Sequence, residues 1–86
     1  MEVTYTPSFI RQYKALDPNL QEEVLEKIEQ FKNIKNHKAL KVHKLTGRLK
    51  DRYSFSVNYK IRIVFQYHSK KEVLLFSLRI YDVFKR

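Results

Sequence analysis

Apolar residues recur along this chain with two different periods, which divide it into helical and extended segments. Residues 2–6 alternate polar and apolar side chains, and this pattern predicts a short strand that ends at a proline. In residues 8–16 and 18–33 the apolar side chains recur every three or four positions, which predicts two amphipathic helices. Asp17 followed by Pro18 is typical of a helix start, because the carboxylate caps free amides and proline fits the first helical position.

The second half of the chain changes to period two. Three strands are predicted, over residues 52–58, 59–67 and 73–80, with a polar turn at residues 68–71 before the last of them. In that last strand we expect Leu74, Phe76, Leu78 and Ile80 on one face and Val73, Leu75, Ser77 and Arg79 on the other. Residues 33–51 follow neither period and predict an ordered basic loop that turns at Gly47, the only glycine.

The order β-α-α-β-β-β predicts a single α+β domain over residues 1–86, with a mostly antiparallel four-stranded sheet and both helices on one face. If the larger apolar set packs under the helices, the opposite face of the sheet is open to solvent. The side chains expected on this open face are Ser54, Ser56, Lys60, Arg62 and Arg79. The sequence therefore predicts a polar, cationic face with few carboxylates.

The formal net charge of +9 is concentrated in one half of the chain. Residues 1–31 hold three basic and six acidic side chains, whereas residues 32–86 hold fifteen basic and three acidic ones. Charge segregated in this way favours a polyanion or an acidic protein as partner. A merely soluble basic surface is the plainer interpretation of the same charge.

Composition excludes several kinds of chemistry. The chain has no cysteine, so disulfides, thiolate nucleophiles and sulfur-ligated zinc are excluded, and one glycine cannot form a glycine-rich phosphate loop. The histidines and acidic residues of the basic half are widely separated, so we expect no metal and no small-molecule cofactor. No apolar run is long enough to span a bilayer and no leader is recognisable, which predicts a soluble, cytoplasmic protein.

Metal-free chemistry on an anion remains, and RNA cleavage fits these residues. The 2′-OH of RNA attacks the adjacent phosphate, so the protein supplies only a base, an acid and cations. His43, Arg62 and Arg79 are the candidates for these roles, although a solvated histidine, a strand salt bridge and a surface arginine are the structural alternatives. Tyr81 and Phe84 near the C-terminus are aromatic residues that either stack on bases or anchor the tail.

Five short motifs, in order along nearly the whole chain, carry a family resemblance. They are Tyr5-Thr6-Pro7-Ser8-Phe9, the helix at residues 21–28, His43-Lys44-Leu45-Thr46-Gly47, the strand pair at residues 53–65, and Asp82-Val83-Phe84. With these motifs the chain resembles the RelE/ParE superfamily of toxins from bacterial type II toxin–antitoxin systems, in particular its RelE/StbE-like messenger-RNA interferase branch. The resemblance implies a RelE-like fold, ribosome-dependent cleavage of messenger RNA, and neutralisation by a cognate antitoxin.

The resemblance also implies roles for individual residues. His43 matches a position used for proton transfer, Arg62 matches the strand arginine that binds the scissile phosphate, and Phe84 matches the residue that stacks on a base. Tyr81 stands where close relatives carry a histidine, so it is the candidate acid or base positioner, with Arg79 as a second cation on the phosphate. The further RNA-binding candidates are Lys44, Arg48, Lys50, Arg52 and Lys60.

Two alternatives stay open at this stage. One is a non-nucleolytic toxin in the manner of the ParE toxins, which inhibit DNA gyrase. The other is a catalytically weakened RNA-binding homologue, because Tyr81 replaces the usual histidine and Ser54 and Ser56 occupy strand positions that are basic in some members of the family.

Overall fold

The computed structural model describes residues 1–47 and 51–80. In chain order the elements are β1 (Glu2–Tyr5), α1 (Pro7–Lys14), α2 (Pro18–Phe31), the 3-10 helix η1 (Ile34–Asn36), β2 (His43–Lys44), β3 (Tyr53–Ser56), β4 (Ile61–Tyr67) and β5 (Glu72–Ile80). The strands form one sheet in the order β1-β5-β4-β3-β2, in which β1 runs parallel to β5 and the other pairs are antiparallel. The predicted α+β class, with two helices and a mostly antiparallel sheet, is confirmed.

The strand count differs from the prediction by one, because part of the basic loop joins the sheet. His43 and Lys44 pair with Ser54 and Tyr53 and so form the edge strand β2. Two residues are too few for an alternating pattern to be visible in a sequence, and the pairing depends on where the preceding loop places them. The same loop contains η1 and turns at Gly47, whose φ of 71° is in the left-handed region that favours glycine.

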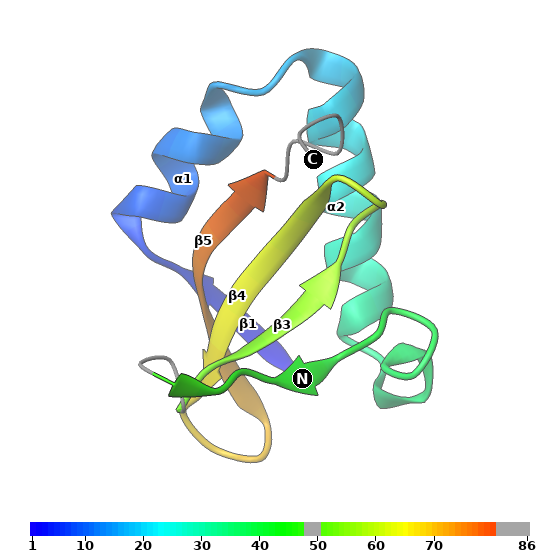
Figure 1. Ribbon diagram of the computed structural model, residues 1–86, viewed down its shortest axis with the longest axis vertical. Helices are drawn as coiled ribbons and strands as arrows, with labels where there is room; N and C mark the ends of the chain where they lie inside the picture. Colours follow the sequence, from blue (N-terminus) through cyan, green and yellow to red (C-terminus); the bar gives the residue numbers. More distant parts are fainter. Residues whose placement is uncertain (48–50, 81–86) are drawn as a thin grey trace.

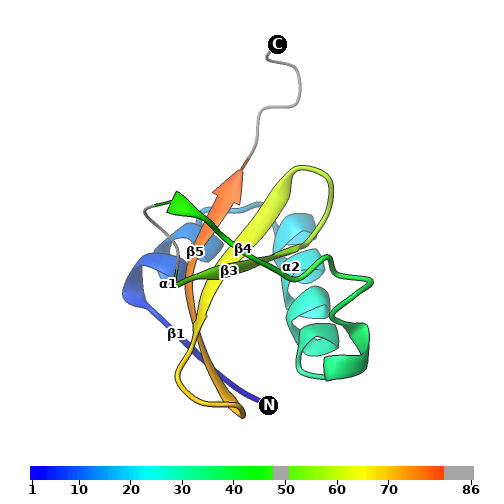
Figure 2. The same ribbon diagram turned by 60° about the horizontal axis from the view of Figure 1, so that its bottom comes forward.

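Both helices cover one face of the sheet, α1 beside β5 and α2 across β3 and β4 (Figures 1 and 2). The hydrophobic core fills the space between the two layers. Phe31 of α2 is its centre, since its ring stacks on Phe55 at 4.2 Å and meets the edge of Phe65 at 4.8 Å. All three rings are fully buried, so the helix layer and the sheet layer are joined by aromatic packing.

Each helix begins directly after a residue whose side chain caps its first turn. Thr6 and Asp17 cap α1 and α2 by accepting hydrogen bonds from the amides of Phe9 and Leu20, both at 3.0 Å. A proline follows each cap at the first helical position, where it has no amide hydrogen to leave unpaired. The predicted helices are therefore confirmed, with α2 ending at Phe31, two residues before the predicted end.

An irregularity between β4 and β5 corrects the predicted faces of the last strand. Phe65 pairs with Leu75, but its neighbour Val64 pairs with Ser77, so Phe76 is an extra residue on β5. Before this bulge it is Val73 and Leu75 that enter the core, together with Leu78 after it. The prediction that Leu74 and Phe76 share a face with Leu78 is thus wrong, because the extra residue reverses the alternation. Ser77 and Arg79 stay on the opposite face, as predicted.

The predicted strands at residues 52–58 and 59–67 leave no residues for a turn between them, and these bounds are wrong. Residues 57–60 form the β3–β4 turn, and Lys60 lies in this turn rather than on a strand. The side-chain oxygen of Asn58 accepts hydrogen bonds from the amides of Lys60 and Ile61, both at 2.8 Å. Asparagine commonly closes turns in this way. The alternation of polar and apolar residues in the sequence continues through the turn, two residues past the end of β3 and two residues before the start of β4.

Within the part of the chain described above, no helix combines the length and the apolar character that crossing a bilayer requires.

Thr6 links the helix start to the bulge and is the basis of a stability prediction. Its hydroxyl donates to the carbonyl of Phe76 at 2.7 Å and accepts from the amide of Phe9. Replacing Thr6→Val keeps the shape but removes both hydrogen bonds, and it should lower the free energy of unfolding by about 2 kcal/mol. Urea denaturation measures this loss.

Thr4→Val is the matched control, because the Thr4 hydroxyl makes only a long contact of 3.4 Å with the carbonyl of Val73. We expect this variant to stay within about 0.5 kcal/mol of the parent. Equal destabilisation by the two substitutions would show that Thr6 has no special role at the bulge.

Candidate functional site

Two rows of side chains cross the sheet face that lies away from the helices, which we call the open face. In the first row, His43 of β2 pairs with Ser54 of β3, Ser54 with Val64 of β4, and Val64 with Ser77 of β5. In the second row, Ser56, Arg62 and Arg79 come from β3, β4 and β5. Because residues paired across strands point to the same side of a sheet, the pairing brings His43, Arg62 and Arg79 together.

Arg62 is held in the middle of this face by oxygen atoms that carry no charge. Its Nε and Nη2 atoms donate to Ser54 Oγ at 3.2 and 3.0 Å, and Nη2 also donates to the carbonyl of Lys41 at 3.3 Å. Ser54 is only 2% exposed, so its hydroxyl is a fixed anchor. The guanidinium therefore has a defined position and keeps its full positive charge for a ligand.

His43 is fixed next to Arg62 through the same backbone carbonyl. Its Nδ1 atom lies 3.1 Å from the carbonyl oxygen of Lys41 and 3.2 Å from Arg62 Nη2. Lys41 reaches this position with a φ of 59°, which is unusual for a residue other than glycine. Backbone strain of this kind is often found at functional sites, and here it directs one carbonyl toward both side chains.

The two contacts of His43 Nδ1 require different protonation of the ring. A protonated Nδ1 donates to the Lys41 carbonyl and leaves Nε2 with a free lone pair, whereas an unprotonated Nδ1 accepts from Arg62 and leaves the proton on Nε2. The neutral ring can therefore present either a proton acceptor or a hydrogen-bond donor at Nε2. Which of these forms is present depends on where the guanidinium directs its N–H groups.

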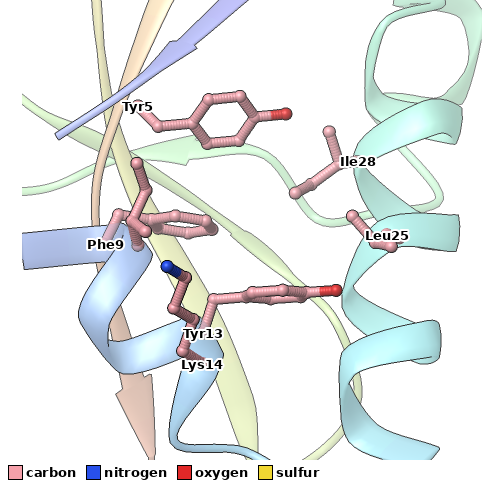
Figure 3. A pocket seen from close by; sticks show the side chains of 7 residues that line it. Tyr5, Phe9, Tyr13, Lys14, Leu25 and Ile28 are labelled. Carbon is pink, nitrogen blue, oxygen red and sulfur yellow. The ribbon is translucent and has the colours of Figure 1, made fainter. Parts of the chain in front are cut away.

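These side chains line a cleft of about 210 Å³, formed by His43, Leu45, Thr46, Ser54, Arg62, Val64 and Arg79. A second hollow of about 250 Å³ lies between α1 and α2, where Tyr5, Phe9 and Tyr13 reach toward Leu25 and Ile28 (Figure 3). Lys14 is the only charged residue in the lining of this second hollow. The hollow between the helices has no histidine and no second cation, whereas the cleft on the open face combines one histidine with two arginines.

Arg62 and Arg79 form a pair of like charges directly opposite each other on β4 and β5. Such a cross-strand pair is unfavourable by itself. Within residues 1–47 and 51–80, the one ion pair is Lys32 with Glu29, at 2.7 Å on α2 and its C-terminal cap, so neither arginine has a carboxylate partner there. Two guanidinium groups without a carboxylate partner on one face give it a local excess of positive charge, which attracts anions.

The described residues bring no three histidine, cysteine, aspartate or glutamate side chains together as ligands.

Three other residues predicted to bind RNA occupy different positions. Lys44 pairs with Tyr53, whose ring packs on Phe65, so alternation directs Lys44 away from His43. Arg52 lies with its guanidinium carbon 3.7 Å from the centre of the Phe76 ring, in a cation–π contact on the open face. Lys60 is exposed in the β3–β4 turn. None of the three lines the cleft of His43 and Arg62.

The remaining predicted site residues lie outside the described residues. They are Arg48, Lys50, Tyr81 and Phe84.

Sequence reasoning missed the anchors of the site. Ser54 was expected only as a polar position on the open face, and Lys41 only as one of several loop lysines. Neither has a signal in the sequence, because their roles depend on a buried hydroxyl and on a backbone carbonyl.

Comparison with solved structures identifies the fold. The RelE–RelB complex of Pyrococcus horikoshii OT3 is similar with a TM-score of 0.74 at 16% identity, covering 95% of this chain and 96% of that one. The YoeB–YefM toxin–antitoxin complex of Staphylococcus aureus has a TM-score of 0.73 at 19% identity, covering 95% and 98%. A YoeB/ParE toxin of Agrobacterium tumefaciens has a TM-score of 0.66 at 18% identity, covering 95% and 100%.

The chain therefore has the fold of the RelE-type toxins, which confirms the resemblance at the level of structure. No protein-family model and no curated protein matches the sequence. The fold is shared while the identity is low, so the activity has to be argued from the site itself.

The arginine pair generates a stability prediction. Arg79→Gln should raise the free energy of unfolding by about 0.5 kcal/mol at low salt, because it removes the repulsion with Arg62. The gain should shrink at high salt, because dissolved ions screen the repulsion between the two guanidinium groups. Urea denaturation at two salt concentrations measures both effects.

Arg11→Gln is the control, since Arg11 lies in the last turn of α1, where a cation is favourable for the helix dipole. This variant should not be stabilised at either salt concentration. If Arg79→Gln instead destabilised the chain by more than about 1 kcal/mol, Arg79 would have a structural role that the pairing does not explain.

Proposed function

We propose that this protein is the toxin of a type II toxin–antitoxin pair and acts as a metal-independent endoribonuclease on messenger RNA at the ribosome. The observation that supports this most directly is the contact of 3.2 Å between His43 and Arg62 in a cleft on the cationic open face. A proton acceptor beside a fixed, uncompensated cation is the minimum that cleavage by the 2′-OH requires.

In the proposed reaction, Arg62 binds the non-bridging oxygens of the scissile phosphate and Arg79 contributes a second positive charge. His43 Nε2 accepts the proton of the 2′-OH, and the 2′ oxygen then attacks the phosphorus. The bond from phosphorus to the 5′ oxygen breaks, which leaves a 2′,3′-cyclic phosphate on one product and a 5′-OH on the other. Tyr81 is the candidate that protonates the leaving oxygen or positions the base.

The shared contact of His43 Nδ1 couples substrate binding to the state of the base. When a phosphate accepts the hydrogen bonds of the Arg62 guanidinium, the His43 ring loses Arg62 as a donor. Its Nδ1 can then carry the proton and donate a hydrogen bond to the Lys41 carbonyl. Nε2 then has a free lone pair, which is the form that accepts a proton. Binding of the anion thus favours the reactive tautomer of His43.

The proposed dependence on the ribosome is consistent with the few groups that the cleft offers. One histidine and two arginines can contact the scissile phosphate but do not by themselves align several nucleotides. Alignment of the 2′ oxygen with the bond that breaks must then come from the way in which the RNA is presented. Messenger RNA ordered on the ribosome is such a substrate.

The proposed protein partner is a cognate antitoxin that brings carboxylates to the open face. Fifteen basic side chains in residues 32–86 favour an acidic segment, and Arg62 and Arg79 lie where such a segment would block the phosphate site. Two of the similar structures are a RelE–RelB complex and a YoeB–YefM toxin–antitoxin complex. These names support a partner of the same kind for this chain.

Arg62→Ala is the first test of the activity. Loss of the phosphate contact should lower the rate of messenger-RNA cleavage by on the order of 10²- to 10³-fold while the chain remains folded. Arg62→Lys should recover only part of the rate, since an ammonium cannot bind two phosphate oxygens as the guanidinium does. Cleavage in a translating extract and circular dichroism of each variant are the measurements. Unfolding of Arg62→Ala would make the arginine structural.

His43→Gln separates a nuclease from a binding protein. Glutamine can still accept a hydrogen bond but cannot carry the proton, so toxicity and ribosome-dependent cleavage should fall together. Antitoxin binding should survive, because the charge of the open face is unchanged. Growth assays, mapping of cut messenger RNA and co-purification with the neighbouring gene product measure the three effects.

Equal toxicity of His43→Gln and the parent, with no cut messenger RNA in either, would contradict the proposed nuclease. A toxin that binds DNA gyrase, in the manner of the ParE toxins, would then be the better account.

A further inference from the structure

The β3–β4 turn carries an aromatic side chain that the core does not use. Tyr59 is 80% exposed, more than any other large apolar or aromatic side chain that the structure describes. Single exposed apolar residues are common on protein surfaces, so exposure alone does not indicate a function. Its place beside the phosphate site is what makes this tyrosine different.

The turn that carries Tyr59 is held rigidly. Asn58 binds the amides of Lys60 and Ile61 through its side-chain oxygen, and its side-chain nitrogen donates to the carboxylate of Glu23 on α2 at 2.9 Å. The hydroxyl of Ser56 donates to the carbonyl of Asn58 at 2.9 Å. The turn is therefore anchored to the strand before it, the strand after it and the helix layer. An aromatic ring on such a support loses little freedom when it binds a ligand.

Tyr59 also lines a second cleft, which shares the residue Arg62 with the cleft of His43. This cleft has a volume of about 390 Å³ and is lined by Lys41, Ser56, Asn58, Tyr59 and Arg62. Arg62 lines the cleft of His43 as well, so one guanidinium lies between the two. No carboxylate lines the second cleft, which offers one aromatic face, two cations and several hydrogen-bonding groups.

We infer that Tyr59 forms a subsite in which its ring stacks on the base of the nucleotide next to the phosphate bound by Arg62. The inference rests on the proposed function, since it takes single-stranded RNA as the ligand. A base has an apolar face for the ring and a polar edge whose N–H groups can donate to Ser56 Oγ, the oxygen of which is still free to accept. Its neighbouring phosphates suit Lys41 and Arg62. The subsite would position the substrate rather than take part in the chemistry.

Binding of an RNA that cannot be cleaved tests this subsite separately from catalysis. A fluorescent hexanucleotide with 2′-O-methyl groups has no free 2′-OH, so fluorescence anisotropy reports its Kd alone. Tyr59→Ala should weaken binding about tenfold, whereas Tyr59→Phe, which keeps the ring, should stay within about twofold of the parent. The slope of log K against log salt should be the same in all three proteins, because no phosphate contact is removed.

Two controls show whether the ring acts on a base. Ile34→Ala removes an apolar side chain that is 66% exposed on η1, outside both clefts, and should leave the Kd unchanged. The second control uses hexanucleotides that each lack one base. When the missing base is the one that stacks on Tyr59, the parent and Tyr59→Ala should bind with the same Kd, because the stacking contact is absent in both complexes. The cycle of protein variant and abasic RNA thus isolates the stacking contact.

Three results would overturn the subsite: an unchanged Kd for Tyr59→Ala, the same loss with every abasic oligonucleotide, or no binding of the hexanucleotide by the parent at low salt. Failure of the nuclease would look different. In that case no variant or parent would cut messenger RNA, while the dependence of the Kd on Tyr59 and on one base would persist.

Discussion

The position of the Arg62 guanidinium is the constraint on which the open face depends. Arg62 lies in the central strand β4 between Ile61 and Ile63, which are both in the core, so its side chain must point away from the helices. A cation in this place needs hydrogen-bond acceptors, and those present are the hydroxyl of Ser54 and the carbonyl of Lys41. Because neither acceptor is charged, the site is fixed in geometry but unbalanced in charge. The proposed binding of a phosphate would correct that imbalance.

The same requirement explains the irregular path of the loop that leads to β2. Lys41 adopts a left-handed conformation, and its carbonyl meets both Arg62 and His43. The flanking residues tie the loop to the fold, since the carbonyl of Leu40 accepts from the amide of Ser56 and the amide of Val42 donates to the carbonyl of His37. His37 in turn stacks on Phe31 at 4.7 Å. The strain at Lys41 is thus supported by the same aromatic core that joins the two layers.

The bulge on β5 determines which side chains of this strand lie on each face of the sheet. The extra residue lets Val73 and Leu75 enter the core before it and Leu78 after it, and it leaves Phe76 on the open face under Arg52. Two side chains of the N-terminal part satisfy the disturbed backbone: Thr6 binds the carbonyl of Phe76, and Gln12 accepts from the amide of Leu78 at 2.7 Å. After the bulge, Arg79 lies on the open face next to Arg62. The alternation of the sequence predicts the same face for Arg79.

The sequence by itself determined the features that depend on neighbouring residues. The sequence determined the helix start at Asp17, the helical and extended periods, the segregation of charge and the outward position of Arg62. All of these follow from local spacing and from chemistry that a few residues carry. The resemblance to the RelE fold rested on the same local motifs. The motif at residues 43–47 likewise makes His43 the candidate for proton transfer, although nothing in the local sequence shows that it contacts Arg62.

Only the tertiary structure decided how those residues meet. The contacts of Arg62 with His43 and Lys41 span 19 and 21 positions, and they depend on a two-residue edge strand and one left-handed backbone angle. The bulge at Phe76 and the turn that exposes Tyr59 likewise change faces and strand ends without changing the apolar pattern. Strand register and backbone turns are set by packing and hydrogen bonds between distant segments, and a one-dimensional pattern does not contain that information.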